Sequence, residues 1–263
     1  ARMGTAVSVC EVEDHILPQD NPDLAELLAD VLQAEGVDVH TGISVTAVSS
    51  HDQQRQVTLM LANGREKKVL ADELLLATGR QPVVGPLNLD EVGVAVTENG
   101  RVSVNDTLQT NIPHIWAAGD VVGPYPFTHV ATRQGRHVAQ CVARRAPEPF
   151  VPGPIPWVTY TDPELAHAGQ TPAELHAAGT EFQTTSLSFA DVPRAVTTGQ
   201  TTGQLKICAD EDGRILGVSI LADKAGELLG PMLLAMRAGL SKDDLAQIIW
   251  PYPTMSGIYG NMA

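Results

Sequence analysis

The chain has 263 residues, room for about two domains, and its 43% hydrophobic and 18% charged residues are typical of a globular protein. Its 17 basic and 31 acidic residues give a net charge of -14, which disfavours nucleic acid and anionic membranes as partners. No apolar run reaches the roughly 20 residues that span a bilayer, so we expect neither a membrane segment nor a signal peptide.

The first part of the chain predicts a strand, a helix and a second strand. Residues 5–11 alternate apolar and polar side chains and end in an acid. Asn21 is a suitable N-cap, Pro22 suits the first helical position, and Gly36 suits the helix end. Residues 37–40 read as the next strand. This order predicts a parallel sheet with a right-handed crossover.

The pattern then changes to an antiparallel meander. Residues 57–61 alternate, Asn63-Gly64 predicts a type I′ hairpin turn, and residues 69–70 return. Residues 74–77 predict a short buried strand, and residues 102–104 predict another brief one.

The stretch Thr110–Asp120 contains an apolar burst, Ile115–Ala118, that stops at Gly119 and Asp120. The burst predicts a buried parallel strand. An acid at the carboxyl end of such a strand suits a sugar or polyol hydroxyl, because ligands bind at that end of open α/β sheets. A core strand followed by an aspartate that caps the next turn is an equally good interpretation. A helix over residues 128–145 follows.

Four prolines among residues 146–154 indicate a linker and a domain boundary. The segment beyond it predicts a mixture of strands and helices with antiparallel pairing. The expected strands are 157–160, 182–189, 205–208 and 215–220, and the expected helices are 172–178, one around 228–236, 242–249 and one after Pro253.

The three cysteines are far apart and have apolar neighbours: Cys10, Cys141 and Cys208. We interpret them as buried thiols and expect neither a metal site nor a redox pair. A cytoplasmic location is the corresponding expectation.

Five motifs occur along the chain in a fixed order. They are Ala77-Thr78-Gly79-Arg80-x-Pro82; Thr110 with Ala117-Ala118-Gly119-Asp120; Thr161-Asp162-Pro163-Glu164-Leu165-Ala166 with Gly169 and Thr171; Gly217 with Ala225-Gly226-Glu227 and Gly239-Leu240; and Pro251-Tyr252-Pro253-Thr254-Met255-Ser256. Together they resemble the flavin-dependent pyridine nucleotide-disulfide oxidoreductases, which include dihydrolipoamide dehydrogenase, glutathione reductase and mercuric reductase. The resemblance extends over essentially the whole chain.

The resemblance implies an α/β part followed by an α+β part. Residues 1–78 correspond to a partial NAD-binding domain, and residues 79–151 to the C-terminal segment of an FAD-binding domain, both pieces of doubly wound folds. Residues 152–263 correspond to a dimerisation domain with an antiparallel sheet, so a homodimer through this domain is expected.

The resemblance also implies cofactor-binding residues. Glu11 matches the acid that binds the adenosine ribose of NAD, and an acid there disfavours NADP; an ordinary solvated glutamate is the alternative. Gly79 lies where the backbone approaches the cofactors, although a turn glycine would look the same.

The flavin contacts implied by the resemblance lie in the next motif. Asp120 corresponds to the residue that hydrogen-bonds the ribityl chain of FAD, with Gly119 as the point of close approach. Thr128, His129 and Ala131 match the helix start whose backbone amides face the isoalloxazine. His129 is expected to contribute its main chain or packing, not general-base catalysis.

The chain also departs from the family pattern. It contains no GxGxxG phosphate loop and no CxxxxC redox pair. Tyr252 stands where dehydrogenases carry the catalytic histidine, and Gly257 stands at the glutamate position. Tyrosine there resembles mercuric reductases. Tyr252 is a metal-site or proton-donating phenol, or an interfacial aromatic residue, and the sequence favours neither.

These observations predict the C-terminal part of an enzyme that passes a hydride from NADH through FAD to a disulfide, a metal or a similar small-molecule acceptor. Without phosphate loops, the chain alone is expected to bind FAD and NAD weakly or not at all and to be inactive. One alternative is a dihydrolipoamide dehydrogenase. Another is a truncated, non-catalytic homologue that serves as a dimerising or regulatory module.

Overall fold

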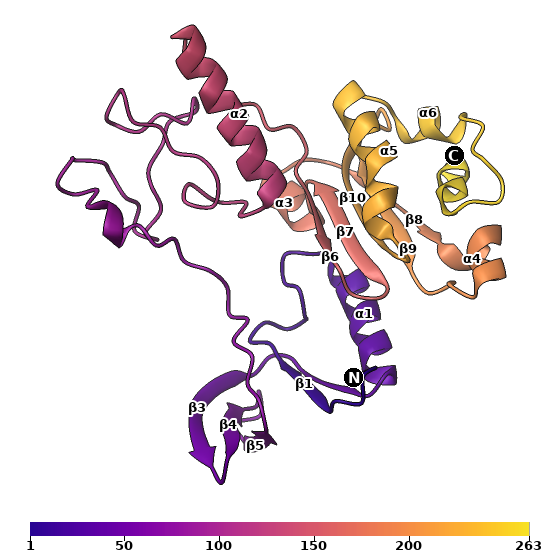
Figure 1. Ribbon diagram of the computed structural model, residues 1–263. Helices are drawn as coiled ribbons and strands as arrows, with labels where there is room; N and C mark the ends of the chain where they lie inside the picture. Colours follow the sequence, from indigo (N-terminus) through magenta and orange to yellow (C-terminus); the bar gives the residue numbers. More distant parts are fainter. Residues whose placement is uncertain (263) are drawn as a thin grey trace. The chain divides into compact units, whose positions relative to one another are not determined.

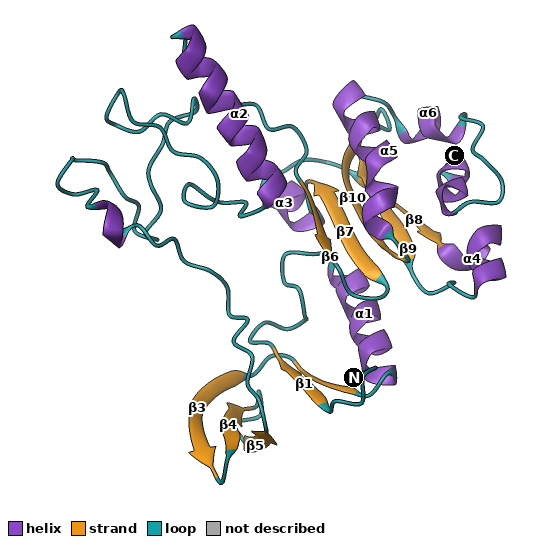
Figure 2. Ribbon diagram, viewed as in Figure 1, coloured by secondary structure: helices purple, strands orange, loops and turns teal. Residues whose placement is uncertain are grey.

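The computed structural model describes residues 1–262, which form two compact units (Figure 1 and Figure 2). Unit 1 comprises Ala1–Leu75 together with Pro156–Ala263, and unit 2 comprises Leu76–Ile155. The N-terminal and C-terminal segments of the chain are therefore grouped in one body, while the sequence-based division at residues 78 and 151 stays a prediction.

The N-terminal elements of unit 1 are a parallel pair of strands joined by a helix. Strand β1 (Val7–Cys10) pairs with β2 (Val37–His40), and α1 (Pro22–Ala34) connects them. The Asn21 side chain accepts a hydrogen bond from the Leu24 amide at 3.4 Å. The predicted cap, helix and parallel crossover are thus confirmed.

An antiparallel meander of three strands follows: β3 (Ser44–His51), β4 (Gln54–Met60) and β5 (Glu66–Ala71). The predicted type I′ turn is wrong. The connecting loop is longer, because Met60 pairs with Glu66, and of the central pair only Gly64 has a positive φ, of 77°. A type I′ turn needs positive φ at both central residues.

The C-terminal part of unit 1 is a five-stranded antiparallel sheet with helices. The strand order is β6-β7-β10-β9-β8, as expected for an α+β domain. The elements are β6 (Pro156–Thr159), β7 (Glu164–Gly169), α3 (Pro172–Ala177), β8 (Gln183–Ser188), α4 (Pro193–Thr198), β9 (Gln204–Ala209), β10 (Ile215–Ala222), α5 (Ala225–Ala238), α6 (Lys242–Ala246), and the 3-10 turns Phe189–Asp191 and Met255–Asn261.

The two faces of this sheet bury different helices (Figure 2). Ile220 and Ala222 of β10 belong to the large core under α5. Leu221, between them, points to the other face, where it packs with Leu24 and Leu28 of α1. All three leucines are 0% exposed, and burying each contributes roughly 1.5–3 kcal/mol. The N-terminal helix therefore shares a core with the C-terminal sheet.

Unit 2 contains one long helix, α2 (Thr128–Arg144), and a 3-10 turn, Gly85–Leu87, among extended segments. The helix confirms its prediction. The expected strands at 102–104 and 115–118 are single bridges, Val96 with Val102 and Gln109 with Trp116.

The predicted strand at residues 74–77 is likewise wrong. These residues form no strand, and Leu75, which belongs to unit 1, is 89% exposed. A buried parallel strand needs partners on both sides, and residues 1–262 offer this segment none.

No helix in the described range is both long and apolar enough to cross a membrane.

Candidate functional site

The candidate cofactor site lies in unit 2, around Gly119 and Asp120. Gly119 has a φ of 84°, a conformation that favours glycine. A Cβ on this residue would meet the Ala131 Cβ at 3.1 Å. The Gly119 amide also donates to Oε1 of Gln134 at 2.6 Å, inside the protein. Gly119 is therefore the point at which this segment approaches helix α2.

The Asp120 carboxylate follows this anchored glycine and is 53% exposed. Its Oδ2 lies 3.5 Å from Nη1 of Arg80. The same guanidinium donates from Nη2 to the Pro126 carbonyl at 3.0 Å. Arg80 follows Gly79, whose φ of 98° turns the backbone here. Arg80 thus joins its own segment to the stretch 120–126, which begins 40 residues further along the chain.

Helix α2 begins immediately after the Pro126 carbonyl. Its N-cap, Phe127, has an apolar side chain, so no side chain caps the first turn. The His129 ring stacks on the Phe127 ring, with centroids 5.4 Å apart and an angle of 7°. The role of His129 at a cofactor site stays a prediction. The amides of a first turn point outward along the helix axis and favour partial negative charge.

These groups suit part of a flavin. An exposed carboxylate accepts hydrogen bonds from the hydroxyls of a ribityl chain, and a helix N-terminus suits the electronegative edge of an isoalloxazine. The Asp120 carboxylate and the Thr128–Ala131 turn supply both chemistries. The sequence has no glycine-rich loop for the pyrophosphate, so the residues present fit one half of the cofactor.

Two further predicted site residues belong to unit 1. Glu11 directly follows β1, and its amide donates to the His40 carbonyl at 2.8 Å. Oε1 of Glu11 accepts from the Glu13 amide at 3.1 Å, which holds the carboxylate over its own turn. Tyr252 is 81% exposed in the segment before the last 3-10 turn.

The structure brings Gly79, Gly119, Asp120 and the start of α2 together through two residues that sequence reasoning did not select. Arg80 was visible as part of a motif, but its two partners lie 40 and 46 residues away. Gln134 is a polar side chain on the buried face of α2, only 6% exposed. A buried amide side chain must find a hydrogen-bond partner, so a glutamine on the inner face of this helix is the signal that could have identified it.

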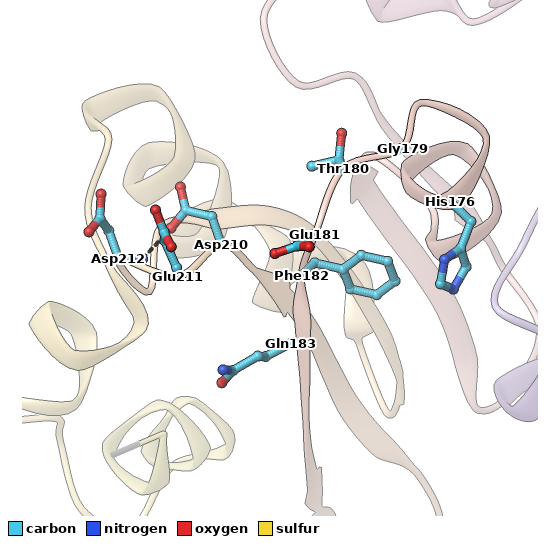
Figure 3. A pocket seen from close by; sticks show the side chains of 9 residues that line it. All are labelled: His176, Gly179, Thr180, Glu181, Phe182, Gln183, Asp210, Glu211 and Asp212. Carbon is cyan, nitrogen blue, oxygen red and sulfur yellow. Dashed lines mark hydrogen bonds between the residues drawn. The ribbon is translucent and has the colours of Figure 1, made fainter.

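A hollow of about 780 Å³ lies elsewhere, in unit 1 (Figure 3). It contains no predicted site residue, and acidic side chains dominate its lining. Its lining residues are His176, Gly179, Thr180, Glu181, Phe182, Gln183, Asp210, Glu211 and Asp212. The Asp210 carboxylate accepts from the amides of Asp212 and Arg214, at 3.0 and 2.8 Å, so this acid stabilises its own turn. No group of three or more metal-ligating side chains is placed for a metal ion anywhere in residues 1–262.

Curated relatives match nearly the whole chain. A mercuric reductase of Streptomyces lividans is 36% identical over 257 residues, which cover 97% of this chain and 54% of the relative. A dihydrolipoyl dehydrogenase of Bacillus subtilis is 32% identical over 260 residues, covering 98% and 55%. The chain thus spans about half the length of these curated relatives.

Solved structures show the same likeness. The flavoprotein disulfide reductase RclA of Escherichia coli superposes with a TM-score of 0.88 at 30% identity, covering 98% of this chain and 59% of that one. LpdA of Mycobacterium tuberculosis gives a TM-score of 0.86 at 27% identity, covering 99% and 56%.

Sequence profiles assign both parts of the chain. The profile described as pyridine nucleotide-disulphide oxidoreductase matches residues 1–135, and the profile of the dimerisation domain of the same enzymes matches residues 155–263. With the antiparallel sheet in the second region and the clustered glycine, aspartate and helix start in the first, the chain belongs to the pyridine nucleotide-disulphide oxidoreductase family.

Proposed function

We propose that this chain is part of a flavin- and NAD-dependent oxidoreductase that reduces a disulfide, a metal ion or a similar small acceptor. The observation that carries the proposal is the exposed Asp120 carboxylate, which Arg80 joins to the Pro126 carbonyl just before the N-cap of α2. A flavin site needs an acceptor for ribityl hydroxyls beside a helix N-terminus, and this arrangement supplies both.

In this proposal Asp120 accepts hydrogen bonds from the ribityl hydroxyls, and the amides of Thr128 and His129 face the isoalloxazine. The Ala131 amide donates to the Phe127 carbonyl at 2.9 Å, so this residue borders the site without offering its own N–H. Gly79 and Gly119 keep the backbone free of side chains beside them. Glu11 accepts from the adenosine ribose of NAD. When bound, flavin supplies the redox chemistry, since it accepts a hydride from NADH and passes electrons to the acceptor.

The chain alone is proposed to hold either cofactor weakly. It has no GxGxxG loop to cradle a pyrophosphate. It also has no CxxxxC pair to serve as the redox disulfide. The acceptor-reducing activity is therefore assigned to the full-length gene product, meaning the protein encoded by the complete gene that contains these residues.

A homodimer through the C-terminal domain is the proposed assembly. Four large apolar or aromatic side chains of this domain are strongly exposed: Tyr160 at 82%, Leu234 at 73%, Ile249 at 97% and Tyr252 at 81%. Exposed apolar side chains mark an interaction surface where they form one contiguous patch, as the proposed dimer interface requires of these four.

The three cysteines are free thiols, which suits a reducing compartment such as the cytoplasm. Cys141 and Cys208 are buried as expected, but Cys10 is exposed.

Flavin content tests the proposal directly. The full-length gene product should purify yellow, with the visible absorbance of oxidised flavin, and Asp120→Asn should lower its flavin occupancy. A matched control is Asp106→Asn, another acid of unit 2, which should leave occupancy unchanged. A colourless full-length protein that takes up no FAD would contradict the proposal.

We propose that the Tyr252 phenol binds a metal-ion acceptor or donates a proton to the acceptor, because its motif resembles that of mercuric reductases. We expect Tyr252→Phe to keep the dimer and lower kcat with mercuric ion by about 100-fold, the lower range of acid–base contributions. If Tyr252→Phe keeps full kcat while Tyr252→Ala weakens the dimer, the residue is an interfacial aromatic instead.

Two other functions have specific support. Dihydrolipoyl dehydrogenases are about as similar to the chain as the mercuric reductase, so lipoamide reduction by the full-length protein is the discriminating assay. The dimerisation profile matches residues 155–263 while the cofactor loops are missing from the sequence, which supports a non-catalytic dimerising module. A stable, colourless dimer of the full-length gene product would favour the module.

A further inference from the structure

We infer that Arg80 is the positioning residue of the flavin site, and this inference rests on the proposed function above. Its guanidinium holds the Asp120 carboxylate and the entry to α2 in one arrangement before a ligand arrives. Arg80 is not assigned a contact with the cofactor. It acts through Asp120.

The guanidinium uses two different nitrogens for this. Nη1 lies 3.5 Å from Oδ2 of Asp120, and Nη2 donates to the Pro126 carbonyl at 3.0 Å. A guanidinium is a planar, rigid fork, so fixing one nitrogen on the Pro126 carbonyl also fixes the direction of the other. A lysine ammonium is a single point on a flexible stem and cannot reproduce this geometry.

The ion pair leaves a ligand-facing atom on Asp120. The pair uses Oδ2, so Oδ1 remains to accept from a hydroxyl. The side chain of Asp120 is 53% exposed and that of Arg80 is 69% exposed, so both are open to solvent. An exposed carboxylate without such a partner would sample several rotamers, and ordering it would weaken binding.

The backbone before Asp120 is fixed independently. The Gly119 amide donates to Gln134 on α2 at 2.6 Å, and Gly119 has no room for a Cβ against Ala131. Gln134 therefore sets the position of the backbone, and Arg80 sets the direction of the carboxylate. The Gln134 and Arg80 contacts both position Asp120 relative to α2. The N-terminus of this helix is the other part of the proposed flavin contact.

If Arg80 orients the carboxylate in this way, removing the Arg80–Asp120 pair should affect ligand binding more than folding. Exposed ion pairs contribute little to stability. Losing the pair should leave the fold intact and release the carboxylate, which should weaken FAD binding by about threefold to fivefold.

The test measures FAD dissociation constants by flavin fluorescence on the apo form of the full-length gene product. The variants are Arg80→Gln, Arg80→Lys, Asp120→Asn and the double variant Arg80→Gln/Asp120→Asn. Arg136→Gln is the control, because it removes an exposed arginine further along α2. We expect Arg80→Gln to bind about three to five times more weakly, Arg80→Lys to recover only part of the loss, and Arg136→Gln to match the wild type.

The double variant separates positioning from a general structural role. Because Arg80 acts through Asp120, the double variant should bind within about twofold of Asp120→Asn alone. If the affinity losses of the two single variants multiply in the double variant, or if Arg80→Gln binds FAD as tightly as the wild type, the inference is overturned. The proposed flavin site would not be affected by either result. A wild-type protein that binds no FAD would overturn the proposed function and this inference together. If Arg80→Gln does not fold, Arg80→Lys and its double variant with Asp120→Asn give the same comparison.

Discussion

The indole Nε1 of Trp157 donates a hydrogen bond to Oδ1 of Asp20 at 2.9 Å, which ties the loop before α1 to strand β6. Asp20 is only 8% exposed. Loss of hydration raises the pKa of its carboxyl from 3.8 to about 6, although the Trp157 hydrogen bond and the nearby His15 act in the opposite direction. The folded protein therefore holds this proton more tightly than the unfolded chain does.

The raised pKa predicts that Asp20→Asn stabilises the protein at neutral pH. Between pH 4 and 6 the folded form binds more protons, so the free energy of unfolding falls as pH rises and the penalty is complete above pH 6. Asparagine keeps an acceptor for Trp157 and carries no charge. We expect a gain of about 1–2 kcal/mol at pH 7, vanishing towards pH 4. Urea unfolding at both pH values checks this, with the exposed Asp30→Asn on α1 as control; a gain of equal size at both would contradict it.

His167 predicts the opposite pH dependence. Its ring is 1% exposed, stacks on Trp157 with centroids 4.3 Å apart, and lies 2.8 Å from the Ser219 hydroxyl. Burial lowers the pKa of His167 from 6.5 to about 4. The unfolded chain binds more protons between these values, so the contribution of His167 to stability is lost as pH falls from 6.5 to 4.

Replacement of His167 should therefore matter less in acid. We expect His167→Gln to destabilise the protein at pH 7 and the difference from the wild type to shrink by up to about 3 kcal/mol at pH 4. Unfolding free energies across this range test it, with the exposed His176→Gln as a control that should follow the wild type. A constant difference would show that His167 is not neutral in the folded state.

Gly119 and Gly135 give a matched pair of alanine substitutions. Gly119 has a φ of 84° and its new Cβ would lie 3.1 Å from the Ala131 Cβ. We expect Gly119→Ala to lower the free energy of unfolding by about 1–3 kcal/mol. Gly135 is inside α2 with nothing within 4 Å of a new Cβ, so its alanine should be neutral or stabilise by up to about 1 kcal/mol. Urea unfolding of the two variants measures both changes in the free energy of unfolding. Equal changes would contradict the close approach of Gly119 to α2.

Ile249 tests the proposed dimer. Its side chain is 97% exposed in the segment after α6. A charge placed within a buried interface is strongly unfavourable, so Ile249→Asp should convert a dimer into monomers in sedimentation velocity. Leu87→Asp, at an exposed leucine of unit 2, should remain dimeric. A dimer that tolerates Ile249→Asp would place the interface elsewhere.

Local signals in the sequence predicted local structure well. Asn21 and Pro22 begin α1 as their capping chemistry requires, and the strand at Val37–His40 was predicted residue for residue. The resemblance to the family and the antiparallel sheet of the second half were also confirmed. The caps and the strand depend on neighbours in sequence, whereas the sheet was expected from the segment's pattern and from the family resemblance.

Some predictions that depended on distant partners failed, and some contacts with distant partners were not predicted. The apolar runs at 74–77 and 115–118 have strand composition, but a strand forms only where another strand pairs with it. Arg80 and Gln134 were not selected as site residues, since their partners, Asp120 and the Gly119 amide, come from other segments. The individual roles of the predicted cofactor residues stay predictions.

The packing of α1 against the C-terminal sheet has a consequence for synthesis. Trp157 follows Asp20 by 137 residues, and Lys206, which pairs with Asp23, follows it by 183. At about 5–20 residues per second, the leucines of α1 leave the ribosome on the order of ten seconds before their partners. During that interval Leu24 and Leu28 can pack with apolar residues of their own segment, such as Ile16 and Val39, but lack the sheet face that Leu221 supplies. That side of the α1 core stays open to chaperones, and to aggregation, until residues 156–222 have been translated.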